Sequence, residues 1–274
     1  MKSFQQQLAD LGKRLGKNTN SLSESISEVP NYSERRKQYD AQANNDIAKL
    51  QLETKQARIQ ALYGASELNE SWTFDRLIED SADVKEAISI AQAFIGAHSD
   101  PSWRNSRAHM MIFYGDYGRG KSHIAGAIAH QLIQQFEITV LYRQLQTLLE
   151  LRFFSYDYQA EDKASMKFRE ISKQLLDVDL LILDEVCVNQ TILKQSAQSW
   201  LGSLLRQRCA DNKNCILITN HHFNDLPKAL GTYCFESIKE YETYKVQFQG
   251  PSRRGSHEEP DELSSKSGYQ PNQF

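Results

Sequence analysis

The segment that most constrains this chain is an eight-residue run in its middle, Gly115-Asp116-Tyr117-Gly118-Arg119-Gly120-Lys121-Ser122. It matches the pattern G-x-x-x-x-G-K-[ST] at every fixed position. The glycines allow successive backbone N–H groups to turn inward around phosphates without clashes from Cβ atoms. A helix starting directly after the loop adds its positive dipole end. The run therefore predicts a buried strand, a tight loop and a helix in that order, with nucleotide phosphates bound by the loop.

Individual residues of the loop are predicted to divide the work of binding ATP and Mg²⁺. Lys121 brings a positive charge to the β- and γ-phosphates, and Ser122 offers its hydroxyl to Mg²⁺. We expect Lys121 to be exposed at the junction of loop and helix and to pack little. The other residues expected to contact the nucleotide are Gly115, Asp116, Tyr117, Gly118, Arg119, Gly120 and His123.

Two adjacent acids end a later apolar run, Leu180-Leu181-Ile182-Leu183-Asp184-Glu185. Neighbouring carboxylates at the end of a buried strand are unfavourable for stability, because like charges repel and burial penalises both. The pair makes chemical sense beside a bound cation. We therefore expect Asp184 to help hold Mg²⁺ and Glu185 to act as the catalytic residue that polarises the attacking water.

A polar amide follows another apolar run, Cys215-Ile216-Leu217-Ile218-Thr219-Asn220. Ligands of open parallel sheets bind at the carboxyl ends of the strands, where this side chain is expected to lie. Asn220 is therefore a second candidate catalytic residue, placed to hold the γ-phosphate or the water. An isolated Asn after a strand is more often a turn former, so this role depends on the other two motifs.

Strand and helix patterns alternate through the middle of the chain and predict an α/β fold. Apolar runs of strand length cover 108–114, 138–142, 180–183 and 215–219, and helical patterns cover 121–135, 145–154, a segment ending near 176, and 195–210. This order predicts a parallel sheet with helices on both faces. We expect one such domain over residues 66–250.

The two ends of the chain differ from this central region in composition. Residues 1–65 are polar and predict a helical N-terminal arm, with a first apolar stripe of Phe4, Leu8, Leu11 and Leu15 and a second helix over 32–62. The arm is either a partner-binding segment, since an amphipathic helix fits a groove, or a solvated and partly disordered leader. Residues 251–274 are predicted to form a flexible tail.

Bulk composition excludes several classes of protein. A formal net charge of −3 on 274 residues does not fit a protein that coats DNA, so any DNA contact must be local. No apolar run approaches eighteen residues, and the first residues lack the apolar core of a signal peptide. The four cysteines form no C-x-x-C pair, which favours buried thiols in a reducing cytoplasm over a metal site or disulfides. We therefore expect a cytoplasmic protein with no membrane contact.

The order of the three motifs resembles the AAA+ class of P-loop ATPases. Within that class the chain is similar to the DnaC-like bacterial and phage helicase loaders, which are related to the transposition helper IstB. Further similarity to these loaders lies in Trp72-Thr73-Phe74-Asp75-Arg76-Leu77, in Lys121-Ser122-His123-Ile124-Ala125, and in the acidic motif over 177–185. The resemblance extends over about residues 72–254.

This resemblance implies an ATP-switched protein whose arm grips the replicative hexameric DNA helicase, opens its ring and delivers it onto single-stranded DNA. It also implies self-association on the helicase ring. One aromatic of the family, near the end of the helix after the second strand, matches Phe153, and Arg152 adjoins it. Base stacking on an aromatic needs no sequence code, which suits loading at varied sites. The competing interpretation is that one of Phe153 and Phe154 closes the core.

The chain departs from the family where arginines are expected to reach a neighbouring subunit's γ-phosphate. Tyr233 and Ser237 stand at those positions. Lysine cannot offer the bidentate fork of arginine, so Lys239 is an imperfect substitute. The remaining candidates are Arg206, Arg208, Arg253 and Arg254. The loop over 189–195, where the family places further DNA contacts, offers only Lys194 as a cation.

Two alternative functions share the same ATP-binding core. The first is an IstB-like ATPase that remodels a protein–DNA complex in transposition or plasmid partition. The second is a helicase-binding adaptor that hydrolyses ATP poorly, which the missing arginines favour and the intact Glu185 opposes. A metabolic kinase fits less well, because no insertion for a phosphate acceptor is apparent.

Overall fold

The computed structural model describes residues 32–79, 81–156, 162–187 and 191–249, together with Gln6 and Ser252. The chain divides into two compact units, Met1–Gln56 and Ala57–Phe274, and each is considered by itself. The predicted stripe of Phe4, Leu8, Leu11 and Leu15 lies outside the described residues, as does the predicted tail over 251–274 apart from Ser252.

Helix α3 (Tyr32–Ala65) is the second helix predicted in the arm, and it runs three residues further than expected. In the first unit its large apolar side chains, Tyr39, Ile47, Leu50 and Leu52, are exposed. In the second unit Ile59 and Leu62 are buried. Leu62 packs in the core with later strands and helices. The second unit begins at Ala57, before the expected boundary at residue 66.

The second unit is built on a five-stranded sheet in the order β2-β3-β4-β1-β5, with every neighbouring pair parallel. This confirms the predicted α/β fold. The strands are β1 (His109–Gly115), β2 (Val140–Gln144), β3 (Leu180–Val186), β4 (Asn214–Thr219) and β5 (Glu242–Phe248). Strand β5 was not predicted, because it pairs only with β1 at the edge of the sheet and alternates polar with apolar residues.

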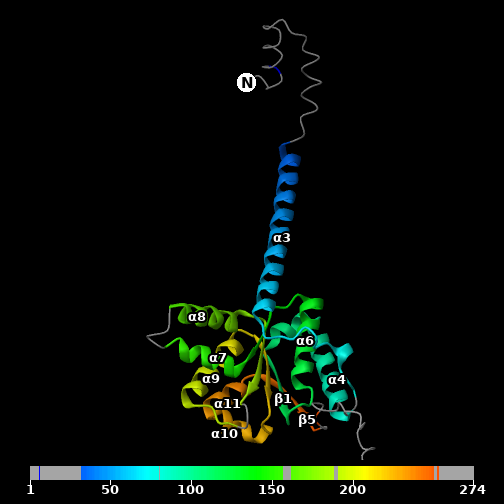
Figure 1. Ribbon diagram of the computed structural model, residues 1–274. Coiled ribbons are helices and arrows are strands. Elements are labelled where there is room, and N and C mark those ends of the chain that lie inside the picture. Colours follow the sequence, from blue (N-terminus) through cyan, green and yellow to red (C-terminus); the bar gives the residue numbers. More distant parts are fainter. Residues whose placement is uncertain are drawn as a thin grey trace, which may run out of the picture. The chain divides into compact units, whose positions relative to one another are not determined.

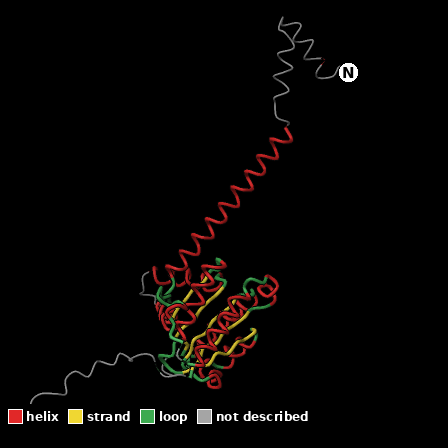
Figure 2. Tube along the Cα trace, turned by 90° about the vertical axis from the view of Figure 1, so that its right-hand side faces the viewer, coloured by secondary structure: helices red, strands yellow, loops and turns green. Residues whose placement is uncertain are grey.

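Helices cover both faces of this sheet (Figures 1 and 2). One face packs against α4 (Ala82–Ala97) and α6 (Lys121–Phe136). The other packs against α7 (Leu145–Phe154), α8 (Asp162–Asp177), α9 (Gln195–Ala210), α10 (Leu226–Leu230) and α11 (Thr232–Lys239). The short elements are α5 (Pro101–Ser106), η1 (Phe74–Arg76) and η3 (Phe223–Asp225).

Strand β1 has apolar side chains on both faces, because helices cover the sheet on both sides. Met111 and Phe113 belong to the core beneath α4 and α6, whereas Met110 and Ile112 belong to the core on the opposite face. A parallel strand in this position has a continuous apolar sequence, as the sequence of β1 indicated. Among the described residues, no helix has the length and apolar character needed to cross a bilayer.

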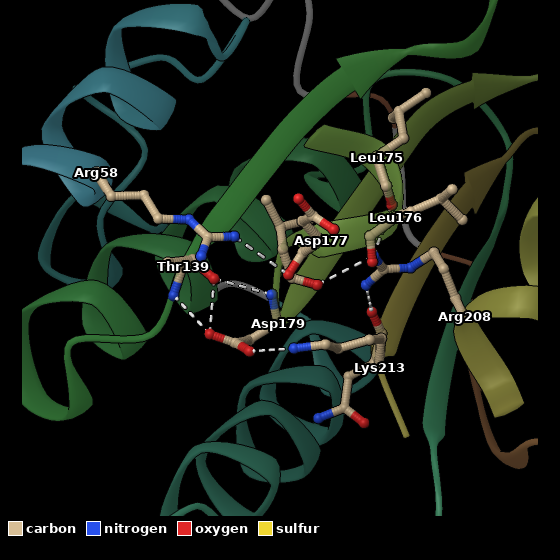
Figure 3. A network of polar contacts seen from close by, with 10 residues as sticks. Arg58, Thr139, Leu175, Leu176, Asp177, Asp179, Arg208 and Lys213 are labelled. Atoms are coloured by element: carbon tan, nitrogen blue, oxygen red, sulfur yellow. Dashed lines mark hydrogen bonds and ion pairs between the residues drawn. The ribbon is translucent and has the colours of Figure 1, made fainter. Parts of the chain in front are cut away.

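A buried arginine on α9 joins the ends of several elements (Figure 3). The Arg208 side chain is fully buried, and its guanidinium donates hydrogen bonds to the carbonyls of Leu175, Leu176 and Val178 around the end of α8, and of Asn214 at the start of β4. The last carbonyls of a helix lack partners within the helix, and a cation satisfies them well. Arg208 is therefore a structural residue and is wrong as a candidate for reaching a neighbouring subunit.

The same end of the sheet carries a second polar cluster, around Asp179 (Figure 3). Its carboxylate accepts hydrogen bonds from the Thr139 hydroxyl at 2.6 Å and from the Lys213 amine at 2.7 Å. These residues precede β2, β3 and β4, so the cluster ties together the beginnings of three neighbouring strands. The opposite, carboxyl end of the sheet carries the motifs identified in the sequence.

We expect Arg208→Met to lower the free energy of unfolding by on the order of 3 kcal/mol, because several buried carbonyls lose their donor. Arg206→Met is a matched control on the same helix. Arg206 is exposed and pairs with Glu240 at 2.8 Å, so its loss should cost less than about 1 kcal/mol. Urea unfolding of both variants measures the difference. Equal losses would contradict the structural role of Arg208.

Candidate functional site

The predicted phosphate loop lies between β1, which ends at Gly115, and α6, which begins at Lys121. All three glycines of the loop have positive φ, at 126° for Gly115, 74° for Gly118 and 89° for Gly120. Residues with a side chain rarely adopt such angles, so the glycines are required by the backbone path. Strand, loop and helix therefore follow one another as the sequence predicted.

Gly115 is also required by its neighbour in the sheet. A Cβ atom at this position would lie 2.2 Å from the Phe248 carbonyl oxygen at the end of β5. Arg119 in the same loop donates a hydrogen bond to that carbonyl at 2.9 Å and pairs with Asp116 at 2.7 Å. The edge strand thus holds the phosphate loop from one side, although no sequence pattern predicted β5.

Lys121 is buried, which corrects the expectation that it is exposed. Only 6% of the residue is accessible, and its amine donates hydrogen bonds to the carbonyls of Gly115 at 2.8 Å and Asp116 at 2.7 Å. The loop wraps around the lysine, so the carbonyls of the loop accept hydrogen bonds from its buried positive charge. Lys121 nevertheless lines the hollow in which phosphates are expected.

The carboxyl end of β3 carries one extra residue relative to β4. Leu183 pairs with Leu217 and Val186 pairs with Thr219, so three steps along β3 match two along β4. Glu185 lies within this bulge and has a left-handed backbone with φ of 55°. In a regular strand Asp184 and Glu185 would point to opposite faces, but a bulge redirects the side chain. Both residues consequently line the same hollow.

That hollow has a volume of about 280 Å³ and brings together most of the predicted ATP-site residues. It is lined by Trp72, Tyr117, Gly118, Arg119, Gly120, Lys121, Ser122, His123, Asp184, Glu185, Ile218 and Asn220. Gly115 and Asp116 do not line it but supply the acceptors for Lys121. Trp72 and Ile218 were not predicted to line the site. Only the fold brings Trp72 to a loop about fifty positions away.

A buried tyrosine on β2 contacts the acid predicted to bind Mg²⁺. The Tyr142 hydroxyl donates a short hydrogen bond to the Asp184 carboxylate. Burial, together with the negative charge of Asp184, raises the pKa of the Tyr142 phenol, so it stays protonated and acts as a donor. Asp184 itself is buried, with 6% exposure. Tyr142 did not emerge from the sequence, because no motif marks it.

A second, apolar hollow adjoins the cradle. It has a volume of about 190 Å³ and shares Gly120 and His123 with the first hollow. Its other lining residues are Arg76, Leu77, Ile78, Val84 and Ile124. His123 Nε2 also lies 2.8 Å from the Thr73 carbonyl, which fixes the segment before η1 against the start of α6. An apolar space of this kind beside a phosphate loop suits a flat, weakly polar ring.

The oxygen donors at the cradle suit Mg²⁺ better than a softer metal. Ser122 offers a hydroxyl and Asp184 a carboxylate, and Mg²⁺ is typically held by one or two carboxylates plus phosphates and water. Among the described residues no group of three or more His, Cys, Asp or Glu could hold a metal ion by itself. Cys187, Cys215 and Cys234 are buried free thiols, and burial raises the pKa of Cys187 and Cys234 to about 12. The expected buried thiols are thus confirmed for these three, whereas Cys209 is half-buried.

The aromatic residues at the end of α7 are exposed. Phe153 is 74% accessible and Phe154 54%, and their rings meet edge to face at 5.9 Å. The interpretation that one of them closes the core is therefore wrong, because the helix ends with both rings facing solvent. The Arg152 guanidinium lies 5.2 Å from the Tyr156 ring centroid and 6.0 Å from that of Trp200. Tyr158 lies outside the described residues.

Two of the cations considered for reaching a neighbouring subunit's γ-phosphate already have partners. Lys239 pairs with Glu236 at 2.6 Å, and Arg206 pairs with Glu240 and lies 4.9 Å from the Tyr233 ring. The Ser237 hydroxyl donates to the Tyr233 carbonyl at 3.0 Å. Arg253 and Arg254 lie outside the described residues.

The chain is similar to a known family of ATP-binding proteins and to proteins of replication initiation. A family model described as IstB-like ATP binding protein matches residues 38–237. The chromosomal replication initiator protein DnaA of Enterococcus faecalis is 27% identical over 162 residues, which cover 59% of this chain and 33% of that protein. The chain matches less than half the length of the curated relatives found, so the similarity concerns one domain of them.

Solved structures share the fold at low sequence identity. The DnaC helicase loader superposes with a TM-score of 0.53 at 16% identity, covering 66% of this chain and 100% of that one. The replication initiator DnaA bound to AMPPCP and single-stranded DNA gives 0.52 at 17% identity, covering 69% and 53%. These similarities confirm an AAA+ P-loop fold.

We expect Glu185→Gln to keep nucleotide affinity while slowing ATP hydrolysis by roughly 10²- to 10⁴-fold, because the amide keeps the shape of the side chain but cannot accept a proton from water. Phosphate release and binding of a fluorescent ATP analogue measure the two effects. Glu150→Gln, at an exposed position on α7, is the control and should leave both unchanged. Unchanged hydrolysis in Glu185→Gln would mean that another residue activates the water.

Proposed function

Because the chain belongs to the family of IstB-like ATP-binding proteins, we propose that it is an ATP-driven loader that places the replicative hexameric DNA helicase onto single-stranded DNA. The chain is an ATPase of the AAA+ class by family and fold. The loading role is supported by the fold shared with a DnaC helicase loader, whose whole chain superposes on this one. The observation that carries the proposal is an ATP cradle in the same domain as an exposed aromatic surface.

In this proposal the cradle residues act on ATP in distinct ways. Backbone N–H groups of the loop and the Lys121 amine bind the phosphates, and the apolar hollow beside Leu77 accepts the base. Ser122 and Asp184 would hold Mg²⁺, which when bound neutralises phosphate charge. Glu185 accepts a proton from the attacking water, and Asn220 orients the γ-phosphate or that water.

The proposed DNA-binding surface combines the exposed rings with nearby positive charge. Phe153 offers an accessible ring for stacking against a base, and Arg152 lies one residue before it. Helix α8, which packs against α7, carries exposed cations at Lys167, Arg169 and Lys173. Salt screens distant charges, so DNA phosphates respond mainly to the charges close to them. A local positive patch can therefore bind DNA although the whole chain has a net charge of −3.

We expect Phe153→Ala to weaken binding of single-stranded DNA roughly five- to hundred-fold, because one stacking platform is worth ~1–3 kcal/mol per base. The melting temperature should stay unchanged, since the ring is 74% exposed. Phe153→Tyr keeps an aromatic face and should retain affinity. Fluorescence anisotropy with a labelled oligonucleotide and ATP measures all three proteins. Equal affinity of the alanine and tyrosine variants would rule out stacking at this residue.

The proposed grip on the helicase lies in the apolar stripe of Phe4, Leu8, Leu11 and Leu15. We expect Leu8→Asp with Leu11→Asp to abolish co-elution with the helicase and to leave ATP affinity unchanged, because the charges interrupt the apolar face. Gln6→Asp with Ala9→Asp adds the same charge on the opposite face of the predicted helix and should leave co-elution intact. Retained co-elution of the Leu8 and Leu11 variant would exclude this stripe as the grip.

A poorly hydrolysing helicase adaptor is the second candidate, favoured by the scarcity of cations for a neighbouring ATP site. Arg208 is buried within the fold, and Lys239 and Arg206 are paired with acids. A wild-type chain that binds ATP and helicase but shows no turnover with helicase and DNA would support the adaptor. Capture of a transposition complex in place of the helicase would instead support the IstB-like remodelling role.

A further inference from the structure

Tyr142 occupies a position in the sheet from which it reaches the end of the neighbouring strand. It pairs with Ile182 on β3, and Asp184 lies two residues further along β3 on the same face. The Tyr142 side chain bridges this diagonal gap, since its hydroxyl reaches the Asp184 carboxylate. The residue is 1% exposed, and its ring packs against Trp72 with centroids 5.5 Å apart.

The hydroxyl of Tyr142 contacts one of the side chains proposed to hold Mg²⁺. It donates a hydrogen bond to Oδ2 of Asp184. The other carboxylate oxygen, Oδ1, accepts from the backbone N–H of Glu185 at 2.6 Å. Both oxygens of Asp184 are therefore held, one from β2 and one from the bulge.

We propose that Tyr142 is a positioning residue for the Mg²⁺ site: it fixes the Asp184 carboxylate in the geometry the ion requires; this inference rests on the proposed magnesium site. Mg²⁺ demands nearly ideal octahedral geometry, so the positions of its ligands matter more than for a larger cation. Each carboxylate oxygen has two acceptor positions. The phenol and the Glu185 N–H use one each, which leaves the others for the ion or its water.

Packing alone does not account for the hydroxyl. A phenylalanine would fill the same space against Trp72, and a buried hydroxyl is costly unless it is hydrogen-bonded. Here its partner is the Asp184 carboxylate, which lines the hollow of the cradle. Groups that orient metal ligands from behind typically change metal affinity by 10- to 100-fold when they are removed.

The test is Tyr142→Phe, with the affinity for the non-hydrolysable analogue AMPPCP measured as a function of Mg²⁺ concentration. Trp72 lines the hollow, so its fluorescence reports binding without any turnover. We expect the Mg²⁺ concentration for half-maximal effect to rise by about 10-fold or more. Affinity in EDTA should change little, because the ring remains; the melting temperature should fall modestly, because the buried Asp184 carboxylate loses one donor and keeps the Glu185 N–H. Tyr114→Phe, on β1, is the matched control and should behave as wild type.

A second variant shows whether Tyr142 acts through Asp184. In an Asp184→Asn background the added Tyr142→Phe change should have little further effect on Mg²⁺ dependence, since the carboxylate it positions is gone. A wild-type protein whose AMPPCP affinity is independent of Mg²⁺ would remove the magnesium site and the inference with it. A wild type that depends on Mg²⁺, with Tyr142→Phe showing the same dependence, would overturn the positioning role alone.

Discussion

The parallel register of β1, β4 and β3 is the constraint on which the site depends. Thr219 of β4 pairs with Tyr114 on one side and with Val186 on the other, which brings the ends of the three strands to one level. The phosphate loop, Asn220 and the two acids therefore meet at one edge of the sheet. Register alone would point Asp184 and Glu185 to opposite faces of the sheet. The bulge in β3 lets both side chains face the same hollow.

Local patterns in the sequence predicted most of this arrangement. The loop of 115–122 and the acids at 184–185 were recognisable because their chemistry requires particular residue types at fixed spacing, and β1 because a doubly covered parallel strand is continuously apolar. Features set by distant contacts were missed. Strand β5 has polar positions because it is an edge, Lys121 is buried because its own loop encloses it, and Tyr142 matters only through its register with β3.

The nucleotide site and the proposed DNA surface share one continuous segment of chain. Tyr142 lies on β2, and the strand leads directly into α7, which ends at the exposed Phe153 and Phe154. The aromatic surface thus lies on the element that follows directly from the strand contacting Asp184, the proposed magnesium ligand. This continuity supports the proposal that DNA affinity depends on the bound nucleotide.

A crystal structure of the chain with AMPPCP and Mg²⁺ tests the proposed site directly. We expect the phosphates bound by backbone N–H groups of residues 116–122, the Lys121 amine turned toward them, and the ion held between Ser122 and Asp184 with Tyr142 still hydrogen-bonded to the carboxylate. Glu185 and Asn220 should face the terminal phosphate. Phosphates bound outside this loop, or an ion held without Ser122 and Asp184, would show that the site is wrong.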